Sequence, residues 1–252
     1  MNIVITMGGL GARFRKAGYT VPKYEIEVRG KTLFEWSMLS LKDFWQEHFI
    51  FLVRAEDQAT RFIEDKCKIL GVEKIHIVEL DHLTKGQAET ALYAQVHWDA
   101  QDSMLVYNID TYVEPGRLKI SQMVGDGAIP CFFAEGTHWS FVRLDERGRV
   151  VEVREKERIS DHCSLGAYYF RSCNLYADLY RRFYVDGSPE ISEQYIAPMY
   201  NVLLADGGDV RLIEIAREAV HVLGTPEELE VFQGPVSKRY NSLGFLEMER
   251  MK

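Results

Sequence analysis

A glycine-rich segment with four cations follows the first, mostly apolar run of the chain, residues 2–7. The segment opens with Gly8, Gly9 and Gly11, and a glycine-rich turn that leaves a buried strand exposes backbone N–H groups to phosphate oxygens. It extends to residue 23, contains no acidic residue, and carries Arg13, Arg15, Lys16 and Lys23. Because the whole chain has a net charge of −8, this local excess of positive charge predicts a polyanionic ligand.

Three phosphate-binding patterns can be compared with this segment. A dinucleotide fingerprint needs a third glycine where the chain has Phe14, and a P-loop needs a Gly-Lys-Ser/Thr sequence that is absent. A tight strand-to-helix turn would explain the glycines but not the cations. The nucleotidyltransferase pattern, Gly-x-Gly-x-Arg followed by Pro-Lys, is fulfilled by Gly9, Gly11, Arg13, Pro22 and Lys23.

Alternating strands and helices must position this loop. The first 110 residues contain short apolar runs typical of buried strands, separated by segments with apolar residues at helical spacing. The strands are expected at 3–7, 49–53, 74–78 and 103–108, and the helices at 33–45, 59–70 and 88–96. Such alternation predicts a parallel sheet covered on both faces, with ligands at the carboxyl ends of its strands.

The second half of the chain is richer in strands. Strands are expected at 128–134, 141–144, 150–154, 165–170 and 210–215, and helices at 173–184, at 193–204 and from Pro226 onward. The basic segment 236–240 precedes an expected amphipathic helix through Met248, which would pack on the body or on a second subunit, so a homo-oligomer stays open. No linker or repeat interrupts the chain, which predicts one domain with a mixed sheet.

Further motifs follow the loop in a fixed order. Gly86-Gln87-Ala88 opens the third helix, Asp110 follows the fourth strand, Glu155-Lys156 precedes a strand with Gly166-Ala167-Tyr168, and Gly224-Thr225-Pro226-Glu227 lies near the end. With these motifs the chain resembles the nucleoside-triphosphate transferases that activate sugar 1-phosphates, the glucose-1-phosphate thymidylyl-, uridylyl- and cytidylyltransferases. The resemblance spans residues 3 to 230.

The resemblance implies an α/β fold, a Rossmann-like (GT-A-like) three-layer sandwich with a mixed, mainly parallel central sheet. Within one domain, 1–252, it implies a nucleotide-binding half at 1–115 and an acceptor-binding half at 116–230. Residues 231–252 would form a C-terminal helical tail.

The implied reaction brings two anions together, because a phosphate monoester attacks an α-phosphate and expels pyrophosphate. Charge neutralisation and positioning are therefore the main requirements. Arg13 would hold the triphosphate and Lys23 the α-phosphate region as catalytic residues. Lys156 would bind the phosphate of the acceptor and Glu155 its body. Asp110, at the carboxyl end of a strand, would hold Mg²⁺, a hard cation that prefers oxygen ligands.

Other positions complete the expected site. The nucleotide is expected at Met7, Gly8, Gly9, Gly11, Asp81, Gly86, Gln87 and Ala88. The acceptor is expected at Glu155, Lys156, Gly166 and Tyr168. Because Gln87, Glu79 and Asp81 could each contact the edge of the base, CTP, UTP and dTTP all stay open.

The chain departs from the family pattern at a second metal ligand. Relatives usually have an aspartate two residues before the late Gly-Thr, where this chain has Val222, which cannot bind a metal. Three explanations stay open. One carboxylate is enough to hold the metal; His221, Glu214 or an acceptor group supplies the missing ligand; or the activity is reduced. Glu157 and Ile109 also replace a usual proline and glycine, so the acceptor is not settled.

The composition excludes several classes of partner. The acidic balance argues against nucleic acid, and no apolar stretch reaches the roughly 20 residues of a membrane span. The four cysteines have no zinc-like spacing, the seven histidines suggest no cluster, and the N-terminus lacks the pattern of a signal peptide. We therefore expect a cytoplasmic protein that binds small molecules.

The sequence predicts a Mg²⁺-dependent nucleotidyltransferase that couples a nucleoside triphosphate to a phosphorylated acceptor and releases pyrophosphate. The expected acceptor is a sugar 1-phosphate for surface (capsule) polysaccharide synthesis, and the alternative is a non-sugar phosphate, phosphocholine or glutamine phosphate, used by a cytidylyltransferase. A GT-A glycosyltransferase and an inactive sugar-nucleotide-binding regulator also stay open.

Overall fold

The structure is a computed structural model that describes residues 1–187, 189, 193–234, 237–240 and 246–249, the last two ranges by their backbone. Its helices are α1 Ala12–Lys16, α2 Leu33–Ser40, α3 Thr60–Leu70, α4 Gln87–Leu92, α5 Cys173–Tyr180, α6 Tyr200–Ala205 and α7 Pro226–Gln233. Its first strands are β1 Asn2–Thr6, β2 Glu27–Val28, β3 Lys31–Thr32, β4 His48–Arg54, β5 Ile75–Leu80, β6 Met104–Asn108, β7 Thr111–Val113 and β8 Gly127–Phe133. The later ones are β9 Ser140–Leu144, β10 Val150–Glu155, β11 His162–Ser164, β12 Ala167–Phe170, β13 Val210–Glu214, β14 Val220–Val222, β15 Ser237–Tyr240 and β16 Leu246–Glu249.

One ten-stranded sheet runs through both halves of the chain, in the order β10-β9-β11-β8-β12-β6-β1-β4-β5, with β13 beside β8. The strands β5, β4, β1 and β6 are parallel, and β13 is parallel to β8. The remaining pairs are antiparallel. The predicted α/β fold with a mixed, mainly parallel central sheet is confirmed, and its parallel part consists of the run β5-β4-β1-β6 and the pair β13-β8.

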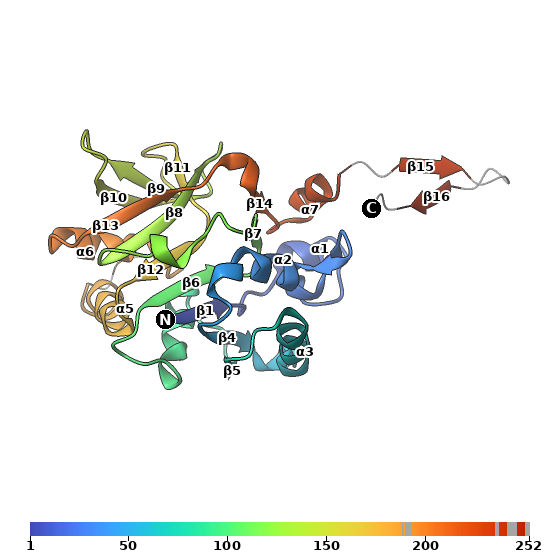
Figure 1. Cartoon of the computed structure of the whole chain (residues 1–252), viewed down its shortest axis with the longest axis horizontal. Helices are drawn as coiled ribbons and strands as arrows, with labels where there is room; N and C mark the ends of the chain where they lie inside the picture. Colours follow the sequence, from blue (N-terminus) through green and yellow to red (C-terminus); the bar gives the residue numbers. More distant parts are fainter. Residues whose placement is uncertain (188, 190–192, 235–236, 241–245, 250–252) are drawn as a thin grey trace.

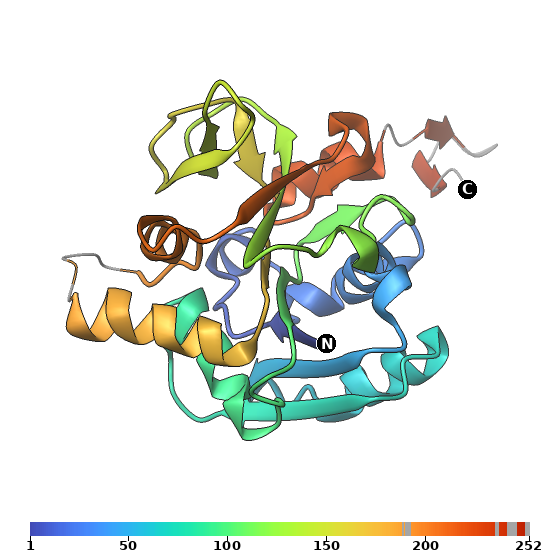
Figure 2. The same ribbon diagram turned by 60° about the vertical axis from the view of Figure 1, so that its left-hand side comes forward.

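Side chains that alternate along the central strands bury both faces of the sheet. In β1, Ile3 and Ile5 pack into one hydrophobic cluster with α2 and α3, whereas Val4 packs into another with α4, α5 and α6. Figures 1 and 2 show helices on both sides of the sheet. The result is the predicted three-layer sandwich.

Strand register brings the ends of β1 and β6 to the same edge of the sheet. Thr6 at the end of β1 is paired with Asn108 at the end of β6, so the loops that follow them are neighbours. A second, two-stranded sheet pairs β7 with β14 and places Val222 opposite Thr111. The backbone N–H of Leu223 also donates to the carbonyl of Asp110 at 2.8 Å. Sequence segments more than 100 residues apart therefore meet beside Asp110.

Two helix predictions are wrong. Residues 193–195 are not helical, because the backbone of Gln194 pairs with the segment 85–88 instead: its N–H donates to Lys85 at 2.8 Å, and its carbonyl accepts from Ala88 at 2.9 Å. In the expected helical tail, β15 and β16 form an antiparallel pair beyond α7, since their backbone groups pair with each other (Figure 1). Val236 lies outside the described residues.

Two predictions from composition, on the cysteines and on membrane spans, can be compared with the structure. The four cysteines, Cys67, Cys131, Cys163 and Cys173, are free and buried. In the described part of the chain, no helix is long and apolar enough to cross a membrane.

Candidate active site

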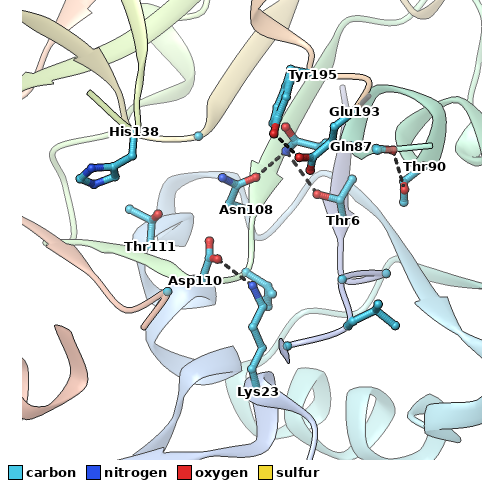
Figure 3. A pocket seen from close by; sticks show the side chains of 18 of the residues that line it. Thr6, Lys23, Gln87, Thr90, Asn108, Asp110, Thr111, His138, Glu193 and Tyr195 are labelled. Carbon is cyan, nitrogen blue, oxygen red and sulfur yellow. Dashed lines mark hydrogen bonds and ion pairs between the residues drawn. The ribbon is translucent and has the colours of Figure 1, made fainter. Parts of the chain in front are cut away.

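A cleft of about 830 Å³ opens at the carboxyl ends of β1 and β6. The wall expected to bind the nucleotide, called the nucleotide-side wall below, is formed by the loop 8–13 and by the segment 83–87. The opposite wall, called the acceptor-side wall, is formed by residues from β9, β10 and β12. Figure 3 shows Lys23, Gln87, Asn108 and Asp110 directed toward this space. The cleft thus joins the two halves that the sequence assigned to two substrates.

An ion pair between Lys23 and Asp110 lies within this cleft. The Nζ of Lys23 is 2.6 Å from Oδ2 of Asp110, and the two side chains are only 19% and 25% exposed (Figure 3). Lys23 comes from a short 3₁₀ helix, Lys23–Glu25, and Asp110 follows β6, so the contact links the glycine-rich loop to the sheet. A cation and an anion are therefore held together at the point where a triphosphate and its metal would compete for them.

A buried network supports the 3₁₀ helix that carries Lys23. Tyr24 is 2% exposed, and its hydroxyl donates to Oδ2 of Asp57 at 3.3 Å. Asp57 accepts from Arg54 at 2.5 Å and 3.3 Å, and the side chains of both residues are less than a tenth exposed. Burial, followed by the charge of Asp57, raises the pKa of Tyr24, so this hydroxyl stays a donor at neutral pH.

We expect Asp57→Ala to destabilise the protein by roughly 3 kcal/mol, because it leaves the buried guanidinium of Arg54 with only the exposed Glu56 as a partner. The free energy of unfolding, measured by urea denaturation, tests this. Asp65→Ala is the matched control, because Asp65 forms only an exposed ion pair with Arg61 on α3. Equal losses in the two variants would contradict the expectation.

The Gly86–Gln87 segment forms the nucleotide-side wall. Gly86 has a φ of 149°, and a Cβ there would lie 2.5 Å from the carbonyl oxygen of Gln194. Only glycine therefore lets the segment 85–88 cross the backbone of Gln194 this closely. The Nε2 of Gln87 donates to Asn108 and, at 3.3 Å, to Thr6. Gln87 is therefore fixed at the ends of β6 and β1 (Figure 3).

A row of tyrosines from α5 holds the crossing of these segments in place. The hydroxyl of Tyr176 donates to the carbonyl of Ala88 at 2.6 Å, and that of Tyr180 donates to Oε1 of Gln194 at 2.8 Å. Tyr184, in the π-helical turn that continues α5, donates to the carbonyl of Tyr195. These three residues, four apart in the chain, are called the tyrosine row below.

The acceptor-side wall contains a partly buried carboxyl group, that of Glu155. Glu155 accepts from the hydroxyl of Ser140, which also lies 3.2 Å from the hydroxyl of Tyr168. Burial raises the pKa of Glu155, partly opposed by its hydrogen bond with Ser140. Lys156 donates to the hydroxyl of Tyr195, and its Nζ lies 3.9 Å from Glu193. This wall can therefore bind hydroxyl or amino groups of an acceptor.

The structure brings most of the predicted site residues to the cleft. Those that line it are Gly8, Gly9, Gly11, Arg13, Lys23, Gly86, Gln87, Asp110, Glu155, Gly166 and Tyr168. Those outside its lining are Met7 and Ala88, which are buried in the core, Asp81, which is exposed and lies 2.7 Å from His82, and Lys156, which is half exposed. The side chains of Met7 and Ala88 cannot contact a ligand because strand and helix packing turn them inward.

Some lining residues had no signal strong enough for the sequence to single them out as site residues: Thr6, Thr84, Thr90, Asn108, Thr111, Ser164, Glu193, Tyr195 and Glu228. Asn108 and Thr6 end the two central strands, a position from which they could have been found. Glu193 and Tyr195 fall in the segment that was expected to be helical.

The residues considered for a second metal ligand differ in whether they line the cleft. Val222 lines the cleft, whereas His221, its neighbour in β14, stacks on Tyr112 with ring centroids 5.3 Å apart. Neither His221 nor Glu214 is among the described residues that line the cleft. Burial lowers the pKa of His221, which fits a ring packed among aromatic side chains.

The donor set at the cleft suits a magnesium ion that binds together with phosphates. Among the residues placed by the structure, no three His, Cys, Asp or Glu side chains gather as a complete metal site. Asp110 nevertheless faces the cleft, and the Oε2 atom of Glu228, which also lines it, is buried with no hydrogen-bond partner in the described chain. Magnesium is usually bound by one or two carboxylates plus phosphates and water, so the residues fit the ion.

Comparison with known proteins identifies relatives among solved structures. A nucleoside-diphosphate-sugar pyrophosphorylase from Vibrio cholerae RC9 is 37% identical over 90% of this chain and 97% of that chain, with a TM-score of 0.84. An inositol-1-phosphate CTP transferase from T. maritima is 18% identical, with 91% of each chain covered and a TM-score of 0.73. A Bacillus anthracis protein described as a glucose-1-phosphate thymidylyltransferase is 14% identical, with 91% and 92% covered and a TM-score of 0.74.

Neither a family model nor a curated protein sequence matches the chain. The two more distant structures share its fold, whereas the V. cholerae relative is similar in sequence over nearly the full length of both chains. The chain belongs to the sugar-phosphate nucleotidyltransferase family and is an enzyme of the nucleotidyltransferase (pyrophosphorylase) type.

Proposed function

We propose that this enzyme couples a nucleoside triphosphate to a sugar 1-phosphate, with Mg²⁺, and releases an NDP-sugar and pyrophosphate. The observation that carries the proposal is the Lys23–Asp110 ion pair, 2.6 Å long, at the junction of the glycine-rich segment and the end of β6. A transfer between two phosphate groups needs both charges at that junction, one for the α-phosphate and one for the metal. The description of the V. cholerae relative as a nucleoside-diphosphate-sugar pyrophosphorylase supports the sugar acceptor.

In this proposal the chain's residues bind and orient the two substrates. Arg13 and the N–H groups of the loop hold the triphosphate, Lys23 neutralises the α-phosphate, and Glu155 binds acceptor hydroxyl groups. Asp110 holds the magnesium ion, which supplies further neutralisation of the triphosphate when bound. A role in surface polysaccharide synthesis and a cytoplasmic location stay predictions from the sequence.

A non-sugar acceptor is the second candidate, and two carboxylates in the cleft favour it. Glu155 and Glu193 both line the acceptor side, close to Trp139 and Tyr195. Carboxylates and aromatic rings together also suit a cationic group, such as the one in phosphocholine or glutamine phosphate. The inositol-1-phosphate CTP transferase shows that this fold accepts a phosphate whose body is not a hexose.

A pyrophosphate-release assay separates these functions. The protein is incubated with Mg²⁺, with CTP, UTP or dTTP, and with glucose 1-phosphate, other sugar 1-phosphates, phosphocholine or glutamine phosphate in turn. We expect pyrophosphate with one nucleotide and a sugar 1-phosphate. Release with phosphocholine or glutamine phosphate alone would replace the sugar acceptor, and nucleotide binding without any pyrophosphate would refute the proposed transfer.

A further inference from the structure

Glu228 places a carboxylate oxygen without a partner beside the cleft. The Oε2 atom is buried and accepts no hydrogen bond from any described residue, although Glu228 is among the residues that line the cleft. A buried carboxylate oxygen without a partner is costly, because the charge loses its hydration and gains nothing in return. Such an atom calls for a ligand that the protein itself does not supply.

A glutamate at this position of a helix start can use its carboxylate to cap the helix, and Glu35 in α2 does so. In Thr32–Glu35, at the start of α2, the glutamate closes a capping box: Oε2 of Glu35 accepts from the backbone N–H of Thr32 at 2.9 Å. Thr225–Glu228, at the start of α7, has the same spacing, and the N–H of Glu228 donates to Thr225 at 3.2 Å. The reciprocal bond does not form in α7, so capping leaves Oε2 of Glu228 free.

Asp110 and Glu228 each have a carboxylate oxygen close to Gly224. A Cβ built on Gly224 would be 3.3 Å from Oδ2 of Asp110 and 3.6 Å from Oε2 of Glu228. The two oxygens are therefore no farther apart than the sum of these distances, a span that one partly hydrated divalent cation can bridge. The bond from Leu223 to the carbonyl of Asp110 fixes the loop that holds this spacing.

We propose that Glu228 supplies the second carboxylate of the magnesium site, beside Asp110 and close to Gly224. It takes over the role that Val222 cannot perform, and it does so from the first turn of α7 instead of from β14. Magnesium prefers hard oxygen donors and keeps several waters, so the ion binds to the carboxylates directly or through water, with nucleotide phosphates in its other positions. This inference rests on the proposed function because the metal binds together with the nucleotide.

Metal binding by variants tests the inference independently of turnover. Mn²⁺, which replaces Mg²⁺ and has an EPR signal when free, is titrated into the protein alone and into the protein with one equivalent of CTP, UTP or dTTP, each compared with the same nucleotide without protein. We expect Glu228→Gln to weaken Mn²⁺ binding about tenfold or more, because the amide lacks the charge of the ligand. The N-cap bond of α7 is donated by the backbone N–H of Glu228 to Thr225, so a change of this side chain preserves the helix start.

Two further variants serve as controls. Glu35→Gln makes the same change in the capping box of α2, away from the cleft, and should bind Mn²⁺ as the wild type does. Gly224→Ala keeps every charge but puts a methyl group 3.3 Å from Oδ2 of Asp110 and 3.6 Å from Oε2 of Glu228, and it should also weaken Mn²⁺ binding. Thermal unfolding of each variant checks that it is folded.

The outcomes separate the two hypotheses. If Glu228→Gln binds Mn²⁺ as tightly as the wild type while the wild type releases pyrophosphate, the role of Glu228 is refuted and the function is not. If the wild type binds Mn²⁺ through Glu228 but releases no pyrophosphate with any acceptor, the proposed function fails and the metal site stands. If the wild type binds no Mn²⁺ with any nucleotide, the metal site itself is refuted.

Discussion

Replacing Lys23 by alanine should lower kcat/KM for pyrophosphate release by roughly a thousandfold while the fold is retained. Lys23 is the cation already held in the cleft, 2.6 Å from Asp110, on a 3₁₀ helix that the network of Tyr24 and Asp57 fixes. Its charge is needed most in the transition state, when negative charge accumulates on the oxygens of the transferring phosphate. The effect should therefore appear mainly in kcat. Steady-state pyrophosphate release, with both substrates varied, measures it.

Lys16→Ala is the matched control for this variant. Lys16 is an exposed cation of α1 in the same glycine-rich segment, outside the described lining of the cleft. The control should keep activity near that of the wild type, which shows whether position or overall positive charge matters. Comparable losses in both variants would indicate that the segment acts only through its net charge.

Asp110→Asn should abolish detectable turnover, because the amide has the shape of the carboxylate but not the charge that a divalent cation requires. The substitution also leaves Lys23 without its ion-pair partner in a position that is 19% exposed. Nucleotide binding should persist, since the backbone N–H groups of the loop are unchanged. Mg²⁺ titrations of pyrophosphate release, from micromolar to high millimolar ion, measure the effect.

Asp178→Asn offers a comparison of the same chemical change outside the cleft. Asp178 lies on α5 and forms an exposed ion pair with Arg181. It should leave the Mg²⁺ dependence unchanged. Full activity of Asp110→Asn at ordinary Mg²⁺ concentrations would rule out Asp110 as the metal ligand, whatever the result for Lys23.

The sequence predicts that the glycine-rich loop and Asp110 meet at one edge of the sheet, because that placement depends on local patterns. The glycine-rich loop must follow β1, and Asp110 must follow β6. The two strands are adjacent and parallel, so the ends of both reach the same edge. A buried strand such as β1 can be predicted from its own residues, because its apolar side chains pack alternately on the two faces of the sheet.

Contacts between distant segments could not be predicted in this way. Residues 193–195 resemble a helix start, yet their backbone is satisfied by the segment 85–88, more than 100 residues earlier. The same holds for Glu228, whose local pattern predicts a capping box and whose position beside Asp110 comes from the β7–β14 pairing. Local propensity is overridden wherever tertiary hydrogen bonds offer the backbone a better partner.

The histidines give a further example. The expectation that they form no cluster is wrong, because His48, His76 and His97 lie together at the edge of the sheet. Nε2 of His48 is 2.7 Å from Nδ1 of His76, and the rings of His76 and His97 stack with centroids 4.2 Å apart. The pairing of β4 with β5 brings His48 and His76 within reach, which spacing along the chain does not reveal.

The tyrosine row has a consequence for how this enzyme can evolve. Tyr176 and Tyr180 hold the nucleotide-side segment and its crossing partner, while Tyr184 holds the backbone of Tyr195 on the acceptor side. In the proposed function, a new acceptor would select for changes near Tyr195, and a backbone shift there would press on Gly86 through Gln194, which contacts it. Changes in acceptor choice and changes in nucleotide choice should therefore be epistatic, so that the two specificities diversify together along a lineage.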